Sequence, residues 1–410
     1  MTGPRLMLRL ALRNLRGSAR RSALTAFTIA VGMVMLVFTV GLSEGSYRRA
    51  IDTAARTGSG HVVVRALGST PFAPRRLPDP AGVLAAVDAV PGALAAPRSR
   101  LPAFVQSSGG AGAVEILGVD PKIEEGLSIL PDSLVEGEWL SVEGHAPAAL
   151  VGRTLARRLD LRRGSRLVVS ATTEGEHESR LVRVRGIFAT GSEEIDSGLM
   201  VTDLQTAGEL LGTPSVHEVA VLLPDLQKAS AVQQTLREAL PDLEVLRWDQ
   251  ALPALGDFIA MDRAGGDAMF FILFGLVALA VLNSVLMNVL RRIREFGLLL
   301  AVGARPSTLF GVVVLESTLL SVAAVVPGLI VGAGVVLYFG HVGLDLGALM
   351  GTGQAIDVGG YDISGTMYPY LPVGRTAIDV VGVILITVAA ALYPAWRATR
   401  VEPVEALSHD

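Results

Sequence analysis

Residues 22–42, SALTAFTIAVGMVMLVFTVGL, contain no charged side chain. As a helix rising roughly 1.5 Å per residue they would extend about 31 Å, which matches a hydrocarbon core about 30 Å thick. A secretory signal has a shorter apolar region, roughly 7–15 residues, and ends in a small-residue cleavage site. The stretch therefore predicts an uncleaved transmembrane helix near the N-terminus.

Three further apolar stretches follow, at residues 269–290, 309–339 and 380–396. The second of these three would be about 46 Å long as a helix, so it must tilt or project beyond the bilayer. The predicted fold is thus an α-helical membrane protein with four transmembrane helices. A large domain, residues 43–268, is inserted between the first two, and its alternating strand-like and helix-like runs predict a mixed α/β (α+β) fold.

Arginines flank the spans on one side only, which predicts the orientation. They precede the first span, separate the second from the third, and follow the fourth: Arg5, Arg9, Arg13, Arg16, Arg20, Arg21; Arg291, Arg292, Arg294, Arg305; Arg397, Arg400. Both termini, the 291–308 segment and the 397–410 tail are therefore expected in the cytoplasm. Residues 43–268 and the 340–379 loop then face outward.

Residues 1–21 carry their arginines at steps of three and four, with Leu8, Leu12 and Leu15 forming a second stripe. Such a pattern is typical of a basic amphipathic helix lying on the inner leaflet. A simple basic flank of the first span, with accidental periodicity, would also explain it.

The composition fits a membrane protein and excludes several other classes. Half of the 410 residues are hydrophobic, only 18% are charged, and the net charge is −4. No basic domain suggests a nucleic-acid partner. Because the chain has no cysteine, the outer domain must fold by burial alone, without disulfides.

Enzymatic motifs are not recognisable. The six histidines show no metal-ligating spacing, and Gly41-Leu-Ser-Glu-Gly45 matches G-x-S-x-G only by letter because it ends an apolar span rather than a strand. No Gly-Lys pair exists for a phosphate-binding loop. The chain is expected to be non-catalytic and to bind no cofactor or metal, with any ATP hydrolysis in a separate subunit.

The 291–305 segment is short, charged at one end and apolar at the other, with Gly303 placed to end a helix. It is either a basic linker or a short helix that docks in a groove of another protein. Arg294-Glu-Phe-Gly-Leu-Leu-Leu-Ala-Val-Gly-Ala304 resembles the R-E-x-G-x-x-x-A-x-G-A signature of FtsX/MacB-type ABC transporter permeases. Tyr393-Pro-Ala-Trp-Arg-Ala-Thr-Arg-Val-Glu-Pro-Val-Glu-Ala-Leu407 is similar to the ending of the same family.

This resemblance implies a coupling helix at which an ABC ATPase dimer, itself binding ATP and Mg²⁺, contacts the permease. The matching positions are Arg294, Glu295, Gly297, Ala301, Gly303 and Ala304. The family also implies a bacterial inner-membrane protein with a MacB-like periplasmic domain, residues 43–268, and a periplasmic 340–379 loop. It further implies pairing with a second permease chain, identical or related.

Within the family, three blocks of the outer domain resemble the lipoprotein-releasing LolC/LolE-like branch: residues 135–140, 150–159 and 184–196. The resemblance implies lipoprotein cargo and a periplasmic acceptor. A MacB-like mechanotransmission exporter of peptides or small amphiphiles, and an FtsX-like regulator of a cell-wall hydrolase, are the alternatives.

Polar side chains within the predicted spans are the remaining candidates. Asn283 and Asn288 in the second span either line a cavity or hydrogen-bond between helices. Glu316 in the third span requires a polar partner, and we expect a structural or coupling role for it rather than proton transport.

Overall fold

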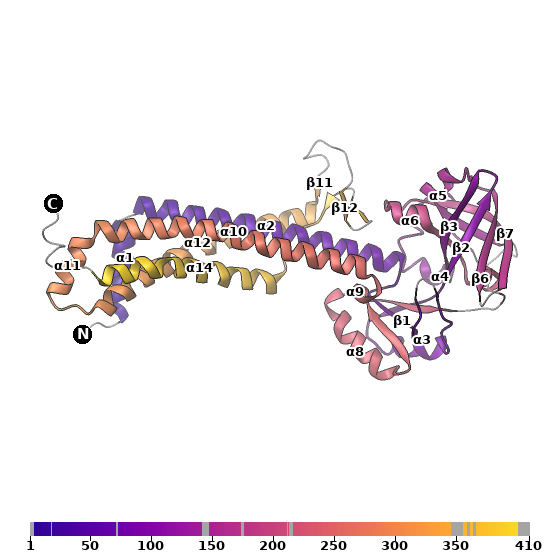
Figure 1. Ribbon diagram of the computed structural model, residues 1–410, viewed down its shortest axis with the longest axis horizontal. Coiled ribbons are helices and arrows are strands. Elements are labelled where there is room, and N and C mark those ends of the chain that lie inside the picture. Colours follow the sequence, from indigo (N-terminus) through magenta and orange to yellow (C-terminus); the bar gives the residue numbers. More distant parts are fainter. Residues whose placement is uncertain are drawn as a thin grey trace. The chain divides into compact units, whose positions relative to one another are not determined.

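The computed structural model describes residues 4–17, 19–70, 73–141, 147–173, 176–210, 212, 216–345, 356–358, 361–363 and 366–400 (Figure 1). The chain forms two compact units. A helical unit comprises Met1–Ser46, Met261–Leu346 and Thr366–Asp410, and a mixed unit comprises Tyr47–Ala260 and Gly347–Gly365. The predicted tail beyond Arg400, with the second half of its signature, lies outside the described residues, as do the side chains of Arg5, Arg16 and Arg21.

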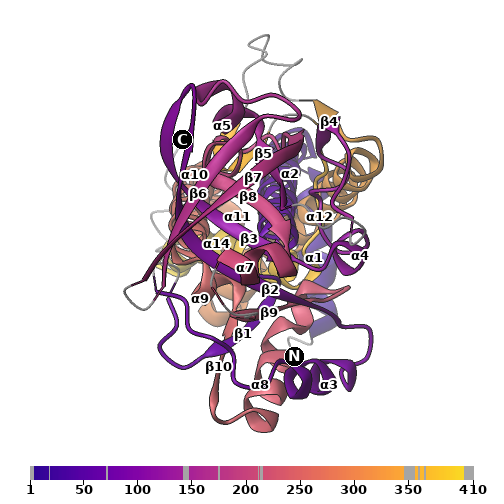
Figure 2. The same ribbon diagram turned by 90° about the vertical axis from the view of Figure 1, so that its right-hand side faces the viewer.

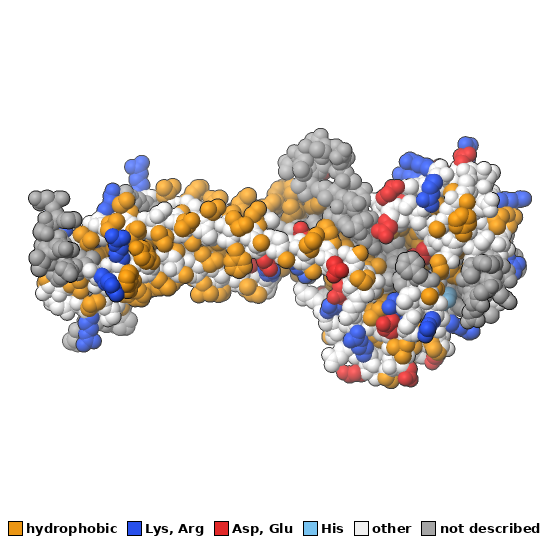
Figure 3. Space-filling model, viewed as in Figure 1, with side chains coloured by type: hydrophobic (Ala, Val, Ile, Leu, Met, Phe, Trp, Pro, Cys, Tyr) orange, Lys and Arg blue, Asp and Glu red, His pale blue; other side chains and the backbone are white. Residues whose placement is uncertain are grey.

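Four long helices confirm the predicted apolar spans. They are α2 (Ala19–Thr57), α10 (Pro253–Arg291), α12 (Pro306–Val342) and α14 (Val373–Thr399), and each is long and apolar enough to cross a membrane. Two shorter helices, α1 (Pro4–Gly17) and α11 (Ile293–Ala301), lie at one end of the helical unit, where arginine side chains gather (Figure 3). Every long helix continues beyond its predicted span, because backbone hydrogen bonding does not stop where the apolar residues do.

Two glycines allow α12 to approach α2 closely. A Cβ atom at Gly328 would lie 2.7 Å from the Ala30 carbonyl oxygen, and one at Gly332 would lie 3.0 Å from the Val37 Cβ. Since residues four apart share one helix face, both glycines meet the same partner helix. Small residues at this spacing let membrane helices pack through backbone contact, which compensates for the missing hydrophobic driving force in lipid.

Gly41 and Gly45 have a packing role as well. The Tyr370 amide donates a hydrogen bond of 2.8 Å to the Gly41 carbonyl. A Cβ at Gly45 would come within 2.2 Å of the Tyr368 carbonyl oxygen. The segment that precedes α14 therefore lies directly on α2. This close approach explains why glycines occupy positions 41 and 45, the two glycines of the G-x-S-x-G match.

Ten strands pair into one sheet in the mixed unit (Figure 2). They are β1 (Val62–Ala66), β2 (Leu94–Ser107), β3 (Gly110–Val119), β4 (Leu134–Gly137), β5 (Ala148–Gly152), β6 (Arg166–Thr173), β7 (Glu176–Phe188), β8 (Leu199–Asp203), β9 (Glu218–Leu222) and β10 (Leu243–Arg247). The helices are α3 (Pro80–Asp88), α4 (Pro121–Glu124), α5 (Arg153–Arg158), α6 (Glu193–Gly198), α7 (Leu204–Leu210), α8 (Ala229–Ala239) and α9 (Trp248–Ala251). The mixed α/β prediction is confirmed.

Strand β2 belongs to both halves of this sheet. Its first residues pair with β9, which continues through β1 to β10. Its later residues pair with β3 and β6, and β3, β8, β5, β7 and β6 close a ring with it. Helices α3 and α8 cover the β9–β1 part, where Val64, Val83 and Leu236 are buried together. Leu101, Ile116 and Met200 belong to the core of the ring.

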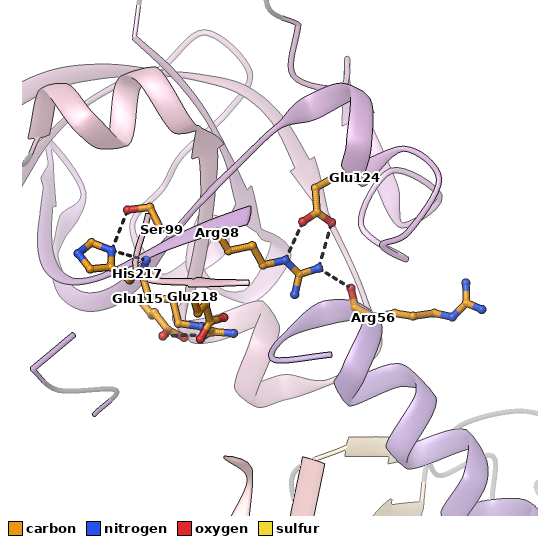
Figure 4. A network of polar contacts seen from close by, with 8 residues as sticks. Arg56, Arg98, Ser99, Glu115, Glu124, His217 and Glu218 are labelled. Atoms are coloured by element: carbon orange, nitrogen blue, oxygen red, sulfur yellow. Dashed lines mark hydrogen bonds and ion pairs between the residues drawn. The ribbon is translucent and has the colours of Figure 1, made fainter. Parts of the chain in front are cut away.

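A buried polar network fixes the end of α2 to β2 (Figure 4). The fully buried Arg98 guanidinium donates to both oxygens of Glu124, at 2.7 and 3.1 Å, and to the Arg56 carbonyl in the last turn of α2. Beside it, His217 Nδ1 accepts from the Arg100 amide at 3.2 Å, and burial lowers the pKa of His217. This neutral acceptor and the paired charges hold β2, β9 and α2 in one arrangement.

Removing Arg98 should destabilise the mixed unit strongly. Arg98→Ala leaves Glu124 buried without its partner, which typically costs about 3–5 kcal/mol. The matched control is Arg65→Ala, whose ion pair with Glu244 is partly exposed (20% and 32%), where about 1 kcal/mol or less is expected. Hydrogen exchange of the β2 and β9 amides in the full-length chain measures both effects. Equal effects of the two substitutions would contradict the conclusion that the buried Arg98–Glu124 pair stabilises the mixed unit more than the partly exposed Arg65–Glu244 pair does.

Gly332→Leu should weaken the α2–α12 contact, because inserted atoms meet Val37 and overpacking typically costs about 1–3 kcal/mol. Gly334→Leu is the control, since a Cβ there meets nothing within 4 Å. The midpoint of thermal unfolding in detergent should fall for Gly332→Leu only. An unchanged midpoint in both variants would show that the contact is unimportant for stability.

Candidate functional site

Helix α11 is the segment that the sequence predicts to dock on a partner. It follows α10 after Arg292 and ends in a motif that uses Gly303 in the left-handed region (φ +92°). There the Gly303 amide donates to the Leu300 carbonyl at 3.0 Å and the Ala304 amide to the Leu299 carbonyl at 2.9 Å. These two bonds are the Schellman arrangement, so Gly303 and Ala304 terminate the helix.

The exposed surface at the C-terminal end of α11 is apolar. Leu298, Leu299 and Val302 are 56%, 41% and 82% exposed. On the opposite face, Phe296 and Gly297 are buried. Exposed apolar side chains gathered on one short helix are typical of a protein contact surface.

The six positions of the signature do not all lie on this face. Arg294, Glu295, Ala301 and Gly303 are exposed, Ala304 is half-buried and Gly297 is buried. The signature therefore marks the helix and its ending. The large side chains that it does not specify, Leu298, Leu299 and Val302, form the apolar surface.

Glu316 has the polar partners that its position requires. Its Oε2 accepts from Arg292 Nη1 at 3.5 Å and from Asn14 Nδ2 at 3.4 Å, and its side chain is only 13% exposed. Arg292 also donates through Nε to Glu295 Oε2 at 2.9 Å. One carboxylate of α12 thus meets α1 and the junction between α10 and α11.

A cavity of about 20 Å³, roughly the space for one water molecule, adjoins these groups. Glu316, Arg292 and Asn288 line it together with Ser22, Ser284 and Ser317. The structure therefore brings two of the three polar candidates, Asn288 and Glu316, to one place.

Asn283 lies elsewhere. With Ser284 and Thr25 it lines an open groove of about 370 Å³ between α2 and α10, whose other walls are mostly apolar. The Thr25 and Ser284 hydroxyls are hydrogen-bonded at 2.9 Å across the two helices. Ser284 lines both spaces, so the groove and the cavity lie on either side of one polar contact.

Comparison with known families identifies the chain. The MacB-like periplasmic core domain family matches residues 22–239, more than half of the chain, and the FtsX-like permease C-terminal family matches residues 268–403. The chain is an ABC transporter permease of the FtsX/MacB family. The second match contains α11, α12 and Glu316, whereas Asn14 and the α2 residues of the candidate site of this permease lie outside it.

Full-length relatives fall into two groups. The lipoprotein-releasing system transmembrane protein LolC of Xylella fastidiosa is 27% identical over 99% of both chains. The macrolide export ATP-binding/permease protein MacB of Nitrobacter winogradskyi is 23% identical over 95% of this permease and 58% of its own length. The pyoverdine export ATP-binding/permease protein PvdT of Pseudomonas syringae is 23% identical over 95% of this permease and 57% of its own length.

Sequence reasoning missed Arg292 and Asn14 as partners of Glu316. Arg292 was visible only as one of several arginines, and Asn14 is 302 positions away from Glu316. The one available signal was the carboxylate itself, because a buried charge in an apolar helix implies a partner. Among the described residues, no cluster of three or more His, Asp or Glu side chains could hold a metal ion.

Cysteine labelling can check the exposed face of α11, since the chain has no native cysteine. Val302→Cys is expected to react readily with a maleimide in detergent. Val289→Cys is the buried control, because Val289 is only 3% exposed, and it should remain unlabelled in the folded permease. Labelling of both positions at similar rates would contradict this placement of α11.

Proposed function

We propose that this permease is the membrane subunit of an ATP-driven transporter that extracts lipoproteins from the inner membrane for transfer to the outer membrane. The observation that carries the proposal is the similarity to LolC along 99% of both chains. The relatives with ATP-binding segments in their names match over little more than half of their own length.

The arginine distribution supports a cytoplasmic position for the α11 end of the helical unit. Arg9, Arg13, Arg291, Arg305 and Arg397 are all exposed there, and inner-membrane proteins retain such residues on the cytoplasmic side. Both termini would then be cytoplasmic, and the MacB-like domain periplasmic.

Docking of a separate ATPase dimer at α11 follows from this orientation. Leu298, Leu299 and Val302 would enter a groove of the ATPase, which is how an amphipathic helix presents apolar side chains to a partner. ATP and Mg²⁺ would be bound by that partner, and the permease itself would not catalyse hydrolysis.

The groove between α2 and α10 suits the lipid part of the cargo. Its walls include Leu24 and Met287, which are 68% and 47% exposed. Each methylene group that leaves the bilayer costs about 0.8 kcal/mol, so an acyl chain needs an apolar surface as well as ATP-driven work. Pairing with a second permease chain would enclose the groove on its open side.

Export of a small amphiphile is the second candidate, supported by the similarity to MacB and PvdT along 95% of this permease. In that case the cargo would enter from the periplasm, and the MacB-like domain would drive it towards an outer-membrane conduit.

Affinity purification of the tagged permease from mild detergent tests the proposal, with mass spectrometry of all co-purifying chains and acylated species. We expect an ATPase and lipoproteins that are released on adding ATP and Mg²⁺. An ATPase with a periplasmic adaptor but no lipoprotein would favour the exporter, and no ATPase at all would overturn the proposal.

A matched pair of variants localises the ATPase contact. Val302→Asp should lower the amount of co-purified ATPase about 30-fold, as expected for a central interface residue worth about 2 kcal/mol. Val373→Asp places the same charge at a site that is 73% exposed on α14, and should leave the ATPase bound.

A further inference from the structure

Three elements of the helical unit meet at one oxygen atom. Glu316 Oε2, on α12, accepts from Asn14 of α1 at 3.4 Å and from Arg292 at 3.5 Å. Arg292 is the single residue between α10 and α11. Through Arg292, Glu316 therefore connects the start of α11 with α12 and α1.

Arg292 makes shorter contacts with α11 than with Glu316. Its Nε lies 2.9 Å from Glu295 Oε2, and its guanidinium carbon lies 5.0 Å from the centre of the Phe296 ring. Phe296 is 1% exposed, so the first turn of α11 and Arg292 are held together. If α11 is displaced, Arg292 is expected to move with it.

Displacement of Arg292 would leave the Glu316 carboxylate in an apolar bundle with one weaker partner. An unpaired charge in such a place is costly, so the carboxylate must follow Arg292 or find other donors. The adjoining cavity offers hydroxyl and amide groups, from Ser22, Ser284, Asn288 and Ser317. A Glu316 carboxylate turned towards these groups would therefore keep hydrogen-bond donors after Arg292 has moved.

The contacts of helix α1 depend on the position of the Glu316 side chain. This helix packs on the start of α12, where Met7 Sδ lies 3.7 Å from the position of a Cβ at Gly311, and Ala11 is fully buried. Asn14 adds the polar contact to Glu316. A displacement of the Glu316 carboxylate would therefore change a polar contact between α1 and α12.

We propose that Glu316 is a positioning residue that couples α11 to α1 and α12, so that a displacement of α11 reaches the membrane helices through Arg292, Glu316 and Asn14. The inference rests on the proposed docking of an ATPase at α11. It goes further by naming the contacts that would carry the displacement and by including α1. Coupling between two sites requires an element whose conformational equilibrium is shifted by both of them.

The test uses the full-length permease with its co-purified ATPase in nanodiscs. Met7→Cys and Gly311→Cys, joined by a short bifunctional thiol cross-linker, form a reporter between α1 and α12 in a chain without native cysteine. Its cross-linking yield is measured with and without a non-hydrolysable ATP analogue and Mg²⁺. We expect the nucleotide to change the yield when Glu316 is present.

Glu316→Gln should reduce this nucleotide response about tenfold, a typical size for a coupling energy, while the amount of bound ATPase stays the same. Glu44→Gln is the matched control, because Glu44 also pairs with an arginine on another helix, Arg263 at 2.9 Å, and it should keep the full response. Exchanging the two charges, Arg292→Glu with Glu316→Arg, should recover part of the response. A merely structural role of Glu316 would instead lower the amount of folded, ATPase-bound permease and leave the nucleotide response of the remaining complex unchanged.

A Glu316→Gln variant that binds ATPase and responds to nucleotide as Glu44→Gln does would overturn this inference alone. A wild-type permease that yields no ATPase would overturn the proposed function and this inference with it. The two failures are therefore distinguishable in one set of preparations.

Discussion

A charged or polar side chain inside an apolar helix bundle needs a partner, and this constraint orders the helical unit. Glu316 meets Arg292 and Asn14, and the hydroxyls of Thr25 and Ser284 meet each other. Because the surrounding apolar side chains cannot replace these partners, each polar contact fixes a particular neighbour for a particular helix face. The glycines at 328 and 332 do the same by shape, since only a backbone without side chains admits α2 so closely. Polar contacts and close approach together select one packing among many that apolar surfaces alone would allow.

The mixed unit depends on a buried charge in the same way. Arg98 and Glu124 are almost completely inaccessible, and the arginine also reaches the last turn of α2. The strand that carries Arg98, β2, is shared by the closed ring and by the β9–β1–β10 part of the sheet. Both α2 and α10 contribute residues to the helical unit and to the mixed unit.

The family architecture leaves the cargo undecided, because a fold does not specify the molecule that it handles. Relatives named for lipoprotein release and for export match along nearly all of this permease. Under either proposed function an ATPase would dock at the exposed apolar side chains of α11. Cargo preference would reside instead in the α2–α10 groove and in the mixed unit. The proposed functions therefore differ in their predictions about cargo and agree about α11 and Glu316.

The sequence by itself determined the four apolar helices, the mixed α/β character of the intervening domain and the ending of α11 at Gly303, because each depends on residues that are close together in the chain. It also marked Glu316 as a charge in need of a partner. Only the tertiary structure decided which partner, since Asn14 is 302 positions away, and which apolar side chains of α11 are exposed. It also separated Asn283 from Asn288: five residues along a helix rotate a side chain by about 140°, so one faces the groove and the other the cavity. Local sequence sets the helix and its period, whereas the face that each residue presents is set by neighbours brought together from distant parts of the chain.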